Sequence, residues 1–397
     1  MTHNPDRWLL PEGIEEILPD EARRLEALRR RLLDLLATWG YELVMPPLIE
    51  YLDALLTGTG TDMDLQTFKL TDQLTGRMMG VRADMTPQAA RIDAHYLKRD
   101  FPVRLCYVGT VLHTRPDEFA GSRELLQVGA ELFGHPGPES DIEIVGLMLA
   151  ALRAAGLAQI HMDLGHVGVF RHLAAAAQLD AGVEGELFEA LQRKSRPEVE
   201  ALLDRCNIAA DMRRCLAALV DLNGGDEVLE EARALFSHAP VQVGQALDML
   251  QMVAASIRRD DPALPVYFDL AELRGYRYYT GAVFSAFVPG YGHAVAQGGR
   301  YDGIGRAFGR ARAATGFSAD LRSLSKLAPA SAANGRGILA PFAGGDTLRQ
   351  RISSLRAAGE RVVVRLPGTD ADAAALGCDR ELVERDGAWA IVGVRQP

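Results

Sequence analysis

The sequence predicts an α+β fold, in which an antiparallel sheet is flanked by helices and accompanied by a helical insertion and a short C-terminal α/β domain. Three observations support this prediction. Strand-like segments occur as neighbouring pairs around turn-rich loops, which is typical of antiparallel pairing rather than of a doubly wound sheet. Long helix-like stretches separate these pairs. Residues 166–258 are rich in alanine and leucine, which marks a change from the strands before them.

The first expected element is a helix from about Asp20 to Trp39. Its apolar residues recur at helical spacing and form a single stripe, which comprises Leu25, Leu28, Leu32, Leu36 and Trp39. Gly40 can end the helix in a left-handed conformation. An extended segment, 41–47, follows and stops at two prolines.

Strand pairs are expected next. Residues 68–81 fit two short strands, and residues 104–114 and 125–134 fit a second pair around a turn-rich loop. Thr57 to Asp64 is rich in glycine, threonine and aspartate and is expected to form a loop. Thr86-Pro87 is expected to open a helix, with Thr86 as its cap and Pro87 at the first helical position. A further helix is expected at 139–155.

Three regions are expected along the chain. A core domain spans 1–328 and contains a helical insertion at about 179–256, after which strand-like sequence returns at 266–270 and 281–288. Residues 329–337, which are rich in alanine, serine and glycine, are expected to be a linker. Residues 338–397 then fit a small α/β domain with a strand at 338–341, a helix at 347–358, a strand at 361–366 and a hairpin around Asp386-Gly387.

Composition excludes several classes of protein. The formal net charge of -10 and the pI of about 5.5 give no basic footprint for nucleic acid. The four cysteines suit neither a zinc site nor a disulfide framework, so we expect reduced thiols in the cytoplasm. The nine histidines show no metal-ligand spacing, and we expect neither metal nor cofactor. No signal peptide, membrane span or nucleophile motif is recognisable.

Residues 125–132 contain the first candidate binding residues. In a strand, side chains alternate between faces, so Gln127, Gly129 and Glu131 share one face while apolar residues fill the other. An amide, a gap and a carboxylate on one face suit a small ligand with donors such as an ammonium or an imidazole N–H. The alternative is an ordinary half-exposed strand.

Two other segments offer similar chemistry. If residues 81–86 are extended, Arg82, Asp84 and Thr86 lie on one face; the alternative is a helix cap beside two solvated charges. Residues 273–281 combine Arg274, which can grip a carboxylate, with Tyr278 and Tyr279, which can wall an aromatic ligand. Here the alternative is the aromatic edge of a core.

Together these segments resemble the histidyl-tRNA synthetase family, a class II aminoacyl-tRNA synthetase family. Residues 20–50 resemble the motif 1 region, which builds the dimer interface in that family. Residues 81–86 resemble the loop that receives the histidine amino group, and residues 274–281 resemble the histidine-specific segment. Residues 298–303 match another family block. The resemblance covers about 8–325. It implies histidine binding by residues Asp84, Thr86, Gln127, Glu131, Arg274, Tyr278 and Tyr279.

The departures from the family lie at its ATP contacts. The family's motif 2 has Phe-Arg-x-Glu, whereas Leu112 stands at the arginine position here and Thr114 at the glutamate position. Motif 3 in the family reads Gly-Leu-Glu-Arg; here residues 320–323 read Asp-Leu-Arg-Ser, so the second arginine becomes Ser323. An aliphatic or hydroxyl side chain cannot supply the electrostatic stabilisation that adenylate formation needs. In addition, Arg277 stands where the family usually has aspartate, which alters the pocket.

With these losses the chain resembles the regulatory subunits of short-form ATP phosphoribosyltransferases. That resemblance implies a protein without catalysis of its own, required by a separate catalytic subunit in the first step of histidine biosynthesis and transmitting feedback inhibition by histidine. Its expected partners are that catalytic subunit and a second copy through the motif 1 region, without tRNA or membrane. One alternative is a divergent active histidyl-tRNA synthetase, which Leu112 and Ser323 disfavour. Another is a pseudo-synthetase that binds RNA or a stress-response kinase-like partner, which the acidic charge and the short tail disfavour.

Overall fold

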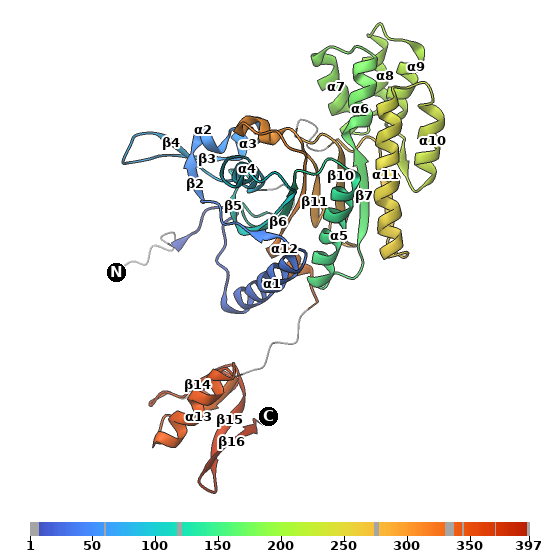
Figure 1. Cartoon of the computed structure of the whole chain (residues 1–397). Coiled ribbons are helices and arrows are strands. Elements are labelled where there is room, and N and C mark those ends of the chain that lie inside the picture. Colours follow the sequence, from blue (N-terminus) through green and yellow to red (C-terminus); the bar gives the residue numbers. More distant parts are fainter. Residues whose placement is uncertain are drawn as a thin grey trace. The chain divides into compact units, whose positions relative to one another are not determined.

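The computed structural model describes residues 8–58, 61–116, 121–273, 278–329, 337–343, 345–369 and 371–394. The chain divides into two compact units, residues 1–328 and 329–397 (Figure 1). The stretch expected to be a linker, 329–337, lies almost entirely outside the described residues. Each unit has its own hydrophobic core, and each is considered by itself.

A nine-stranded sheet, counted over the described residues, forms the frame of the first unit in the order β1-β5-β6-β12-β11-β10-β7-β9-β8. Its strands are β1 (Glu42–Leu43), β5 (Val103–Leu112), β6 (Glu124–Phe133), β7 (His161–His166), β8 (Asn223–Gly224), β9 (Val266–Asp269), β10 (Ala282–Phe287), β11 (Ala296–Arg300) and β12 (Ala314–Asp320). Every pairing from β5 to β7 is antiparallel, whereas β1–β5 and β7–β9 are parallel. The predicted α+β class with a mainly antiparallel sheet is confirmed.

Helices cover this sheet, and a smaller antiparallel sheet stands beside it in the order β2-β4-β3. The small sheet consists of β2 (Ile49–Tyr51), β3 (Phe68–Thr71) and β4 (Met78–Val81). The helices before the helical region are α1 (Pro19–Thr38), α2 (Leu52–Leu55), α3 (Thr61–Gln66), α4 (Thr86–Arg91), a π-helical turn η2 (Ile92–Leu97), α5 (Pro138–Ala154) and α6 (Val167–Ala176). After it come the 3-10 turn η3 (Ile304–Phe308) and α12 (Leu321–Leu327).

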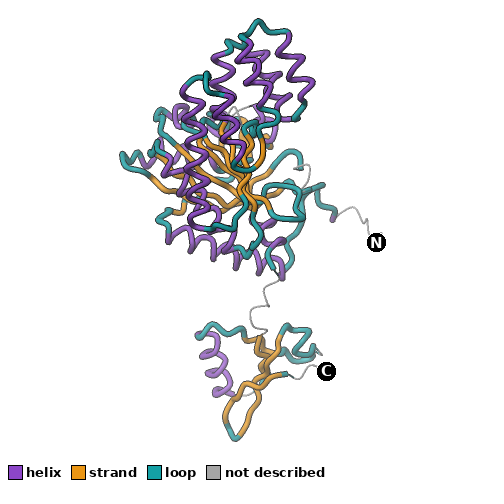
Figure 2. Tube along the Cα trace, turned by 90° about the vertical axis from the view of Figure 1, so that its right-hand side faces the viewer, coloured by secondary structure: helices purple, strands orange, loops and turns teal. Residues whose placement is uncertain are grey.

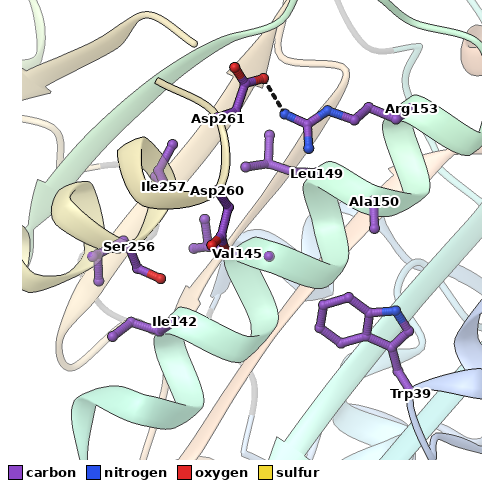
Figure 3. A pocket seen from close by; sticks show the side chains of 12 residues that line it. Trp39, Ile142, Val145, Leu149, Ala150, Arg153, Ser256, Ile257, Asp260 and Asp261 are labelled. Atoms are coloured by element: carbon purple, nitrogen blue, oxygen red, sulfur yellow. Dashed lines mark hydrogen bonds and ion pairs between the residues drawn. The ribbon is translucent and has the colours of Figure 1, made fainter. Parts of the chain in front are cut away.

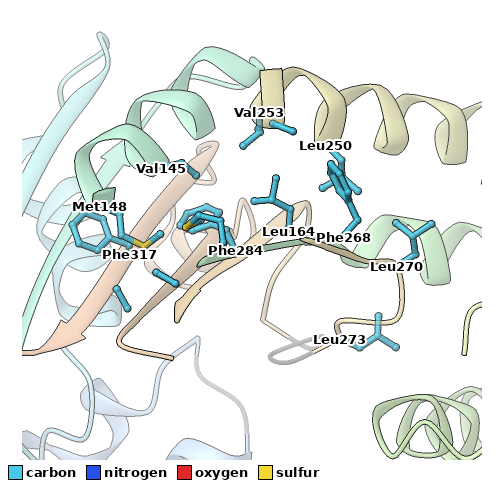
Figure 4. Packing of buried hydrophobic residues seen from close by; sticks show 14 of the residues in the cluster. Val145, Met148, Leu164, Leu250, Val253, Phe268, Leu270, Leu273, Phe284 and Phe317 are labelled. Atoms are coloured by element: carbon cyan, nitrogen blue, oxygen red, sulfur yellow. The ribbon is translucent and has the colours of Figure 1, made fainter. Parts of the chain in front are cut away.

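The main core lies between one face of the large sheet and its covering helices. Four of the five residues of the predicted apolar stripe, Leu25, Leu28, Leu32 and Leu36, are buried there in α1, whereas Trp39 follows the helix and is exposed. Figure 4 shows Val145 and Met148 of α5 beside Phe284 and Phe317 of the sheet, and Leu250 of the helix α11 (Val241–Asp260) beside Phe268. The opposite face of the sheet carries a second cluster around α4, in which Met85, Tyr107 and Tyr301 are buried. The two faces therefore have different roles, and the polar site lies on the second.

Residues 181–260 form a helical region, which stands out as the bundle of tubes at the top of Figure 2. Its helices are α7 (Ala181–Gln192), α8 (Arg196–Asp204), α9 (Ala210–Ala218), α10 (Glu227–Leu235) and α11 (Val241–Asp260). Asp180 caps α7 by accepting hydrogen bonds from the backbone of Gly182 and Val183, which satisfies donors that the first turn leaves open. In α11 the buried residues recur at helical spacing and pack on α5, α6 and β7.

The second unit is a four-stranded sheet with one helix, in the order β14-β13-β15-β16. Its elements are β13 (Gly337–Ala340), α13 (Gly345–Ala357), β14 (Val362–Val364), β15 (Cys378–Arg385) and β16 (Ala388–Gly393). The predicted hairpin is confirmed: Asp386 and Gly387 both have positive φ, as a two-residue turn between right-twisted strands requires. The expected strands and helix of this tail are also present.

Three local predictions are wrong. The expected loop at Thr57 to Asp64 is interrupted, because α3 begins at Thr61. Thr86 does not cap α4 but is its first residue, and Pro87 is the second. Residues 82–85 are not a strand, so Arg82 does not share a face with Asp84 and Thr86; its guanidinium is buried and donates to the carbonyls of Pro46 and Thr110.

Candidate ligand-binding site

Strand β6 presents the predicted polar face. Val128, Ala130 and Leu132 belong to the main core, whereas Gln127 and Glu131 point to the opposite side, where their side chains bond to α4 and to tyrosines. The alternation arises because β6 is regular over ten residues and pairs with β5 and β12 on both edges. The face predicted from the sequence is therefore confirmed.

Asp84 is held against Gln127 at the start of α4. Its Oδ1 accepts hydrogen bonds from Gln127 Nε2 at 2.7 Å, from the Thr86 backbone N–H at 3.0 Å and from the Thr86 hydroxyl at 3.1 Å. The Gln127 amide is fixed in turn, because its Oε1 accepts from the Met85 N–H at 2.9 Å. The three predicted residues Asp84, Thr86 and Gln127 thus meet in one place. Among the described residues, the hydrogen bonds to the Asp84 carboxylate all go to Oδ1, which leaves Oδ2 for another donor.

A chain of hydrogen bonds connects Asp84 to Glu131. The Thr86 hydroxyl lies 3.0 Å from the Tyr107 hydroxyl, which donates to Glu131 Oε1 at 2.8 Å. Tyr301 donates to the other oxygen, Oε2, of the same carboxylate. Glu131 is buried to 1% exposure. The two carboxylates therefore belong to a single polar network, which fixes the position of each.

Aromatic rings close the site on one side. The ring of Tyr278 stacks on that of Tyr301 at 5.0 Å between centroids and meets the ring of Tyr279 edge-on at 5.2 Å. The Tyr278 hydroxyl is buried and has no hydrogen-bond partner among the described residues. Arg274 and Arg277 lie outside the described residues. We call the assembled group the carboxylate–tyrosine cluster; it comprises Asp84, Thr86, Tyr107, Gln127, Glu131, Tyr278, Tyr279 and Tyr301.

The electrostatics of this cluster favour a ligand with donors. Within the described part of the chain, no arginine, lysine or histidine forms an ion pair with Asp84 or Glu131. Burial raises the pKa of Glu131 to about 8, and the nearby charge of Asp84 raises it further, against the hydrogen bonds from Tyr301 and Tyr107. Two converging carboxylates without a cationic partner fit a small ligand that brings an ammonium or N–H donors of its own.

The raised pKa of Glu131 predicts a pH dependence of stability. The folded chain holds the Glu131 proton up to about pH 8, whereas an ordinary glutamate loses it near the value of 4.5. The free energy of unfolding should therefore fall as pH rises between these values, by at most about 1.4 kcal/mol per pH unit. In thermal melts from pH 6 to 9, the melting temperature should fall more steeply with pH for the native chain than for Glu131→Gln, whose side chain has no proton to lose. Parallel curves would contradict this.

Tyr107 and Tyr301 were not among the predicted site residues. Tyr107 reaches the cluster from β5, where it lies opposite Gly129 in the pairing with β6. A β-carbon at Gly129 would lie 2.5 Å from the Tyr107 hydroxyl, so the gap between Gln127 and Glu131 is filled from the neighbouring strand. Gly316 has the same role on β12, because a β-carbon there would overlap the Glu131 carboxylate. Gly129 and Gly316 were the sequence features that could have indicated side chains from other parts of the chain at these positions.

The two positions that depart from the synthetase pattern are also placed. Leu112 ends β5 opposite Glu124 and is partly buried. The Ser323 hydroxyl donates to Asp320 at 2.7 Å and lies 3.2 Å from the Tyr291 hydroxyl. Arg322, which directly precedes Ser323, forms ion pairs with Glu15 and Glu21. These carboxylates neutralise its charge. Neither position supplies a cation for a phosphate.

A separate groove lies between α1, α5 and α11 (Figure 3). Trp39, Val145, Leu149 and Ile257 line it, and an ion pair between Arg153 and Asp261 spans one end. Its packing is against the covering helices, on the core side of the sheet, whereas the carboxylate–tyrosine cluster lies on the other side. The groove is mainly apolar and lacks the convergent polar groups expected of a site for a small polar ligand.

Comparison with known proteins places the chain in a family. The family profile for histidyl-tRNA synthetase matches residues 13–324. The ATP phosphoribosyltransferase regulatory subunit of Alkalilimnicola ehrlichii is 60% identical over 384 residues, 96% of each chain. That of Thioalkalivibrio sulfidiphilus is 59% identical over 379 residues, 95% of this chain and 96% of that protein. This chain belongs to the ATP phosphoribosyltransferase regulatory subunit family. The profile for the ATP phosphoribosyltransferase subunit HisZ C-terminal domain matches residues 335–392.

Solved structures agree with this assignment. An ATP phosphoribosyltransferase regulatory subunit/histidyl-tRNA synthetase from Bacillus halodurans C is similar with a TM-score of 0.81 and 28% identity, over 93% of this chain and 95% of that one. Histidyl-tRNA synthetase from Nostoc sp. PCC 7120 has the same fold, with a TM-score of 0.78 and 18% identity over 98% and 97% of the two chains. The predicted resemblance to both families is confirmed.

Three structural findings bear on the function classes considered. The four cysteines are free thiols. Among the described residues, no group of histidine, cysteine, aspartate or glutamate side chains is arranged to hold a metal ion. No helix in the described ranges is long and apolar enough to cross a bilayer.

Proposed function

We propose that this chain is a non-catalytic subunit that binds histidine at the carboxylate–tyrosine cluster and, in complex with the short-form catalytic subunit of ATP phosphoribosyltransferase, both supports activity and transmits feedback inhibition. Its membership of the regulatory subunit family gives the coarse role. One observation supports histidine binding in particular: Asp84 and Glu131 belong to one hydrogen-bonded network and have no cationic partner among the described residues.

Histidine matches the groups that this cluster leaves open. Its ammonium would donate to Asp84 Oδ2, the carboxylate oxygen that the Gln127 amide does not contact. Its imidazole N–H would donate to Glu131, walled by Tyr278 and Tyr301. The ammonium would supply a positive charge at Asp84, and the imidazole N–H would supply a hydrogen-bond donor at Glu131. Arg274, whose guanidinium can grip a carboxylate in bidentate fashion, would bind the histidine carboxylate.

The lack of chemistry follows from Leu112 and Ser323. Adenylate formation needs cations preorganised around the phosphates. Leu112 is aliphatic, and the Ser323 hydroxyl is engaged by Asp320 and Tyr291. Arg322 is the nearest guanidinium in the chain sequence, but it is paired with two carboxylates. What remains is the half of a synthetase site that holds the amino acid.

Feedback inhibition requires a difference in affinity. Histidine inhibits only if it binds the inhibited assembly more tightly than the active one. The ratio of these two affinities sets how far histidine shifts the equilibrium from the active to the inhibited assembly. We further propose that two copies associate through the motif 1 region and that the complex acts in the cytoplasm without tRNA. The acidic chain and the short second unit support the last point.

The deciding experiment mixes this chain with a short-form catalytic subunit and follows phosphoribosyl-ATP formation. We expect activity to rise on addition of this chain and to fall again on addition of histidine. Histidine should show no such effect on the catalytic subunit alone. Unchanged activity on mixing would contradict the proposed role, and a rise without histidine inhibition would contradict the sensor function alone.

The enzyme alternative has its own assay. The synthetase profile over residues 13–324 is the observation that favours it. Purified chain should fail to catalyse histidine-dependent exchange between ATP and pyrophosphate, whereas a histidyl-tRNA synthetase measured in parallel should catalyse it. Filter binding with tRNA should likewise show no retention. Positive exchange would mean that this chain retains adenylate chemistry.

A further inference from the structure

Arg300, the last residue of β11, is buried at 5% exposure and forms an ion pair with Asp141, which is fully buried at 0%. Its Nε and Nη2 both donate to Asp141 Oδ2, at 3.0 and 2.7 Å. Nη2 also donates to the Ser140 hydroxyl at 2.7 Å and to the Gly137 carbonyl at 3.0 Å. The guanidinium therefore fastens β11 to the beginning of α5.

The backbone around Arg300 holds the tyrosines of the cluster. Tyr301 follows it directly, donates to Glu131 and stacks on Tyr278. The Arg300 carbonyl accepts from the Thr280 N–H at 2.7 Å, immediately after Tyr278 and Tyr279. The next residue, Asp302, donates its N–H to the Thr280 hydroxyl at 3.0 Å. Both tyrosine segments are thus tied to one residue.

Gly299, the residue before Arg300, makes a third contact with the tyrosines. A β-carbon at Gly299 would lie 2.9 Å from the Tyr279 ring, so this ring packs on the bare backbone of β11. A shift of β11 would move all three rings relative to Glu131, because Glu131 lies on β6, which is joined to β11 through β12 and not directly. Fixing β11 therefore fixes the spacing between the tyrosine wall and the carboxylate.

We propose that Arg300, through Asp141, is a positioning residue that sets histidine affinity by holding Tyr278, Tyr279 and Tyr301 against Glu131. This inference rests on the proposed function and concerns the same site. A buried ion pair is weak evidence for added stability, because desolvation offsets its attraction. Its value here is geometric, because the guanidinium engages several acceptors in fixed directions that few other side chains can reproduce. These acceptors are the carboxylates of Asp141 and Asp302, the Ser140 hydroxyl and the carbonyls of Gly137 and His135.

The chain offers a matched control for general destabilisation. Arg312 and Asp93 form another buried ion pair, with side-chain exposures of 9% and 2%. Arg312 bonds to Asp93 and to the Phe101 carbonyl, both at 2.7 Å, and to no member of the cluster by these contacts. Asp93→Asn therefore removes a charge of the same kind at similar depth without releasing β11.

The experiment compares the native full-length chain with Asp141→Asn, Arg300→Lys and Asp93→Asn. Calorimetric titration with histidine, well below each melting temperature, should give an affinity about tenfold weaker or more for Asp141→Asn. Arg300→Lys should also weaken binding, since it keeps the charge but loses the two-point contact. Asp93→Asn should lower the melting temperature but keep the native affinity. Native affinity in a folded Asp141→Asn or Arg300→Lys chain would overturn the inference.

A readout without ligand separates this inference from the proposed function. The near-ultraviolet circular dichroism of the stacked tyrosines should change in Asp141→Asn and Arg300→Lys but not in Asp93→Asn. If the native chain fails to bind histidine, the proposed function fails, and the tyrosine signal still tests whether Arg300 positions these rings. An unchanged near-ultraviolet circular dichroism signal in both Asp141→Asn and Arg300→Lys would by itself overturn the positioning role of Arg300.

Discussion

At pH 8.5, above the pKa of about 8 at which the Glu131 carboxyl ionises, Glu131→Gln is expected to raise the dissociation constant for histidine by about 10- to 100-fold, since a hydrogen bond to a charged group contributes about 1.5–3 kcal/mol. Glutamine keeps the shape of the side chain and can still meet Tyr107 and Tyr301, but it replaces an ionisable acceptor by an amide. Isothermal titration gives the affinity, and the histidine inhibition curve of the reconstituted complex should shift by a similar factor. Activity without histidine should stay at the native level.

Glu143→Gln is the control for this change. Glu143 is a partly buried carboxylate on α5 that pairs with Arg104 and accepts from Tyr41, both outside the cluster. Its loss should alter stability without altering histidine affinity. Equal effects of the two substitutions on affinity, or an unchanged inhibition curve for Glu131→Gln, would remove Glu131 from the ligand site.

The second large effect is expected on self-association. β1 lies at the end of the large sheet, and the adjoining segment exposes Leu43, Met45, Leu48 and Ile49. Met45 is 76% exposed, and we expect exposed apolar side chains that occur so close together in the chain to be covered by a second copy. Since truncating a central interface residue costs about 2 kcal/mol or more, Met45→Asp combined with Leu48→Asp should weaken self-association by more than about 30-fold.

Sedimentation equilibrium measures this effect directly. The native chain should behave as a dimer and the double variant as a monomer at micromolar concentration. Leu74→Asp is the control, because Leu74 is 95% exposed at the turn between β3 and β4 and is not part of this edge. A double variant that stays dimeric, or a native chain that is monomeric, would exclude the motif 1 region as the contact between copies.

The predictable part of the site came from short-range regularity. Gln127 and Glu131 could be assigned to one face because a strand repeats every two residues, and β6 has no bulge over that stretch. The stripe of α1 was predictable in the same way from helical spacing. In both cases the neighbours that decide the orientation are a few residues away in the chain.

The unpredicted part depended on contacts between distant segments. Tyr107 and Tyr301 reach Glu131 from sequence separations of 24 and 170 residues, which no local pattern encodes. The role of Thr86 was misassigned because its hydroxyl is engaged by Asp84 and Tyr107, and α4 begins one residue earlier than the Thr-Pro signal indicated. Only the glycines at 129 and 316 hinted that side chains from other strands fill those gaps.

Gly316 has a consequence for genetic selection. Because no β-carbon fits between β12 and the Glu131 carboxylate, any residue other than glycine at this position displaces that carboxylate while every polar group of the cluster remains encoded. Bacteria selected for growth on a toxic histidine analogue, or for histidine overproduction, should therefore yield substitutions at Gly316 as well as at the polar residues. An alignment-based search for binding residues would pass over such a position, since glycine offers a ligand no side chain of its own.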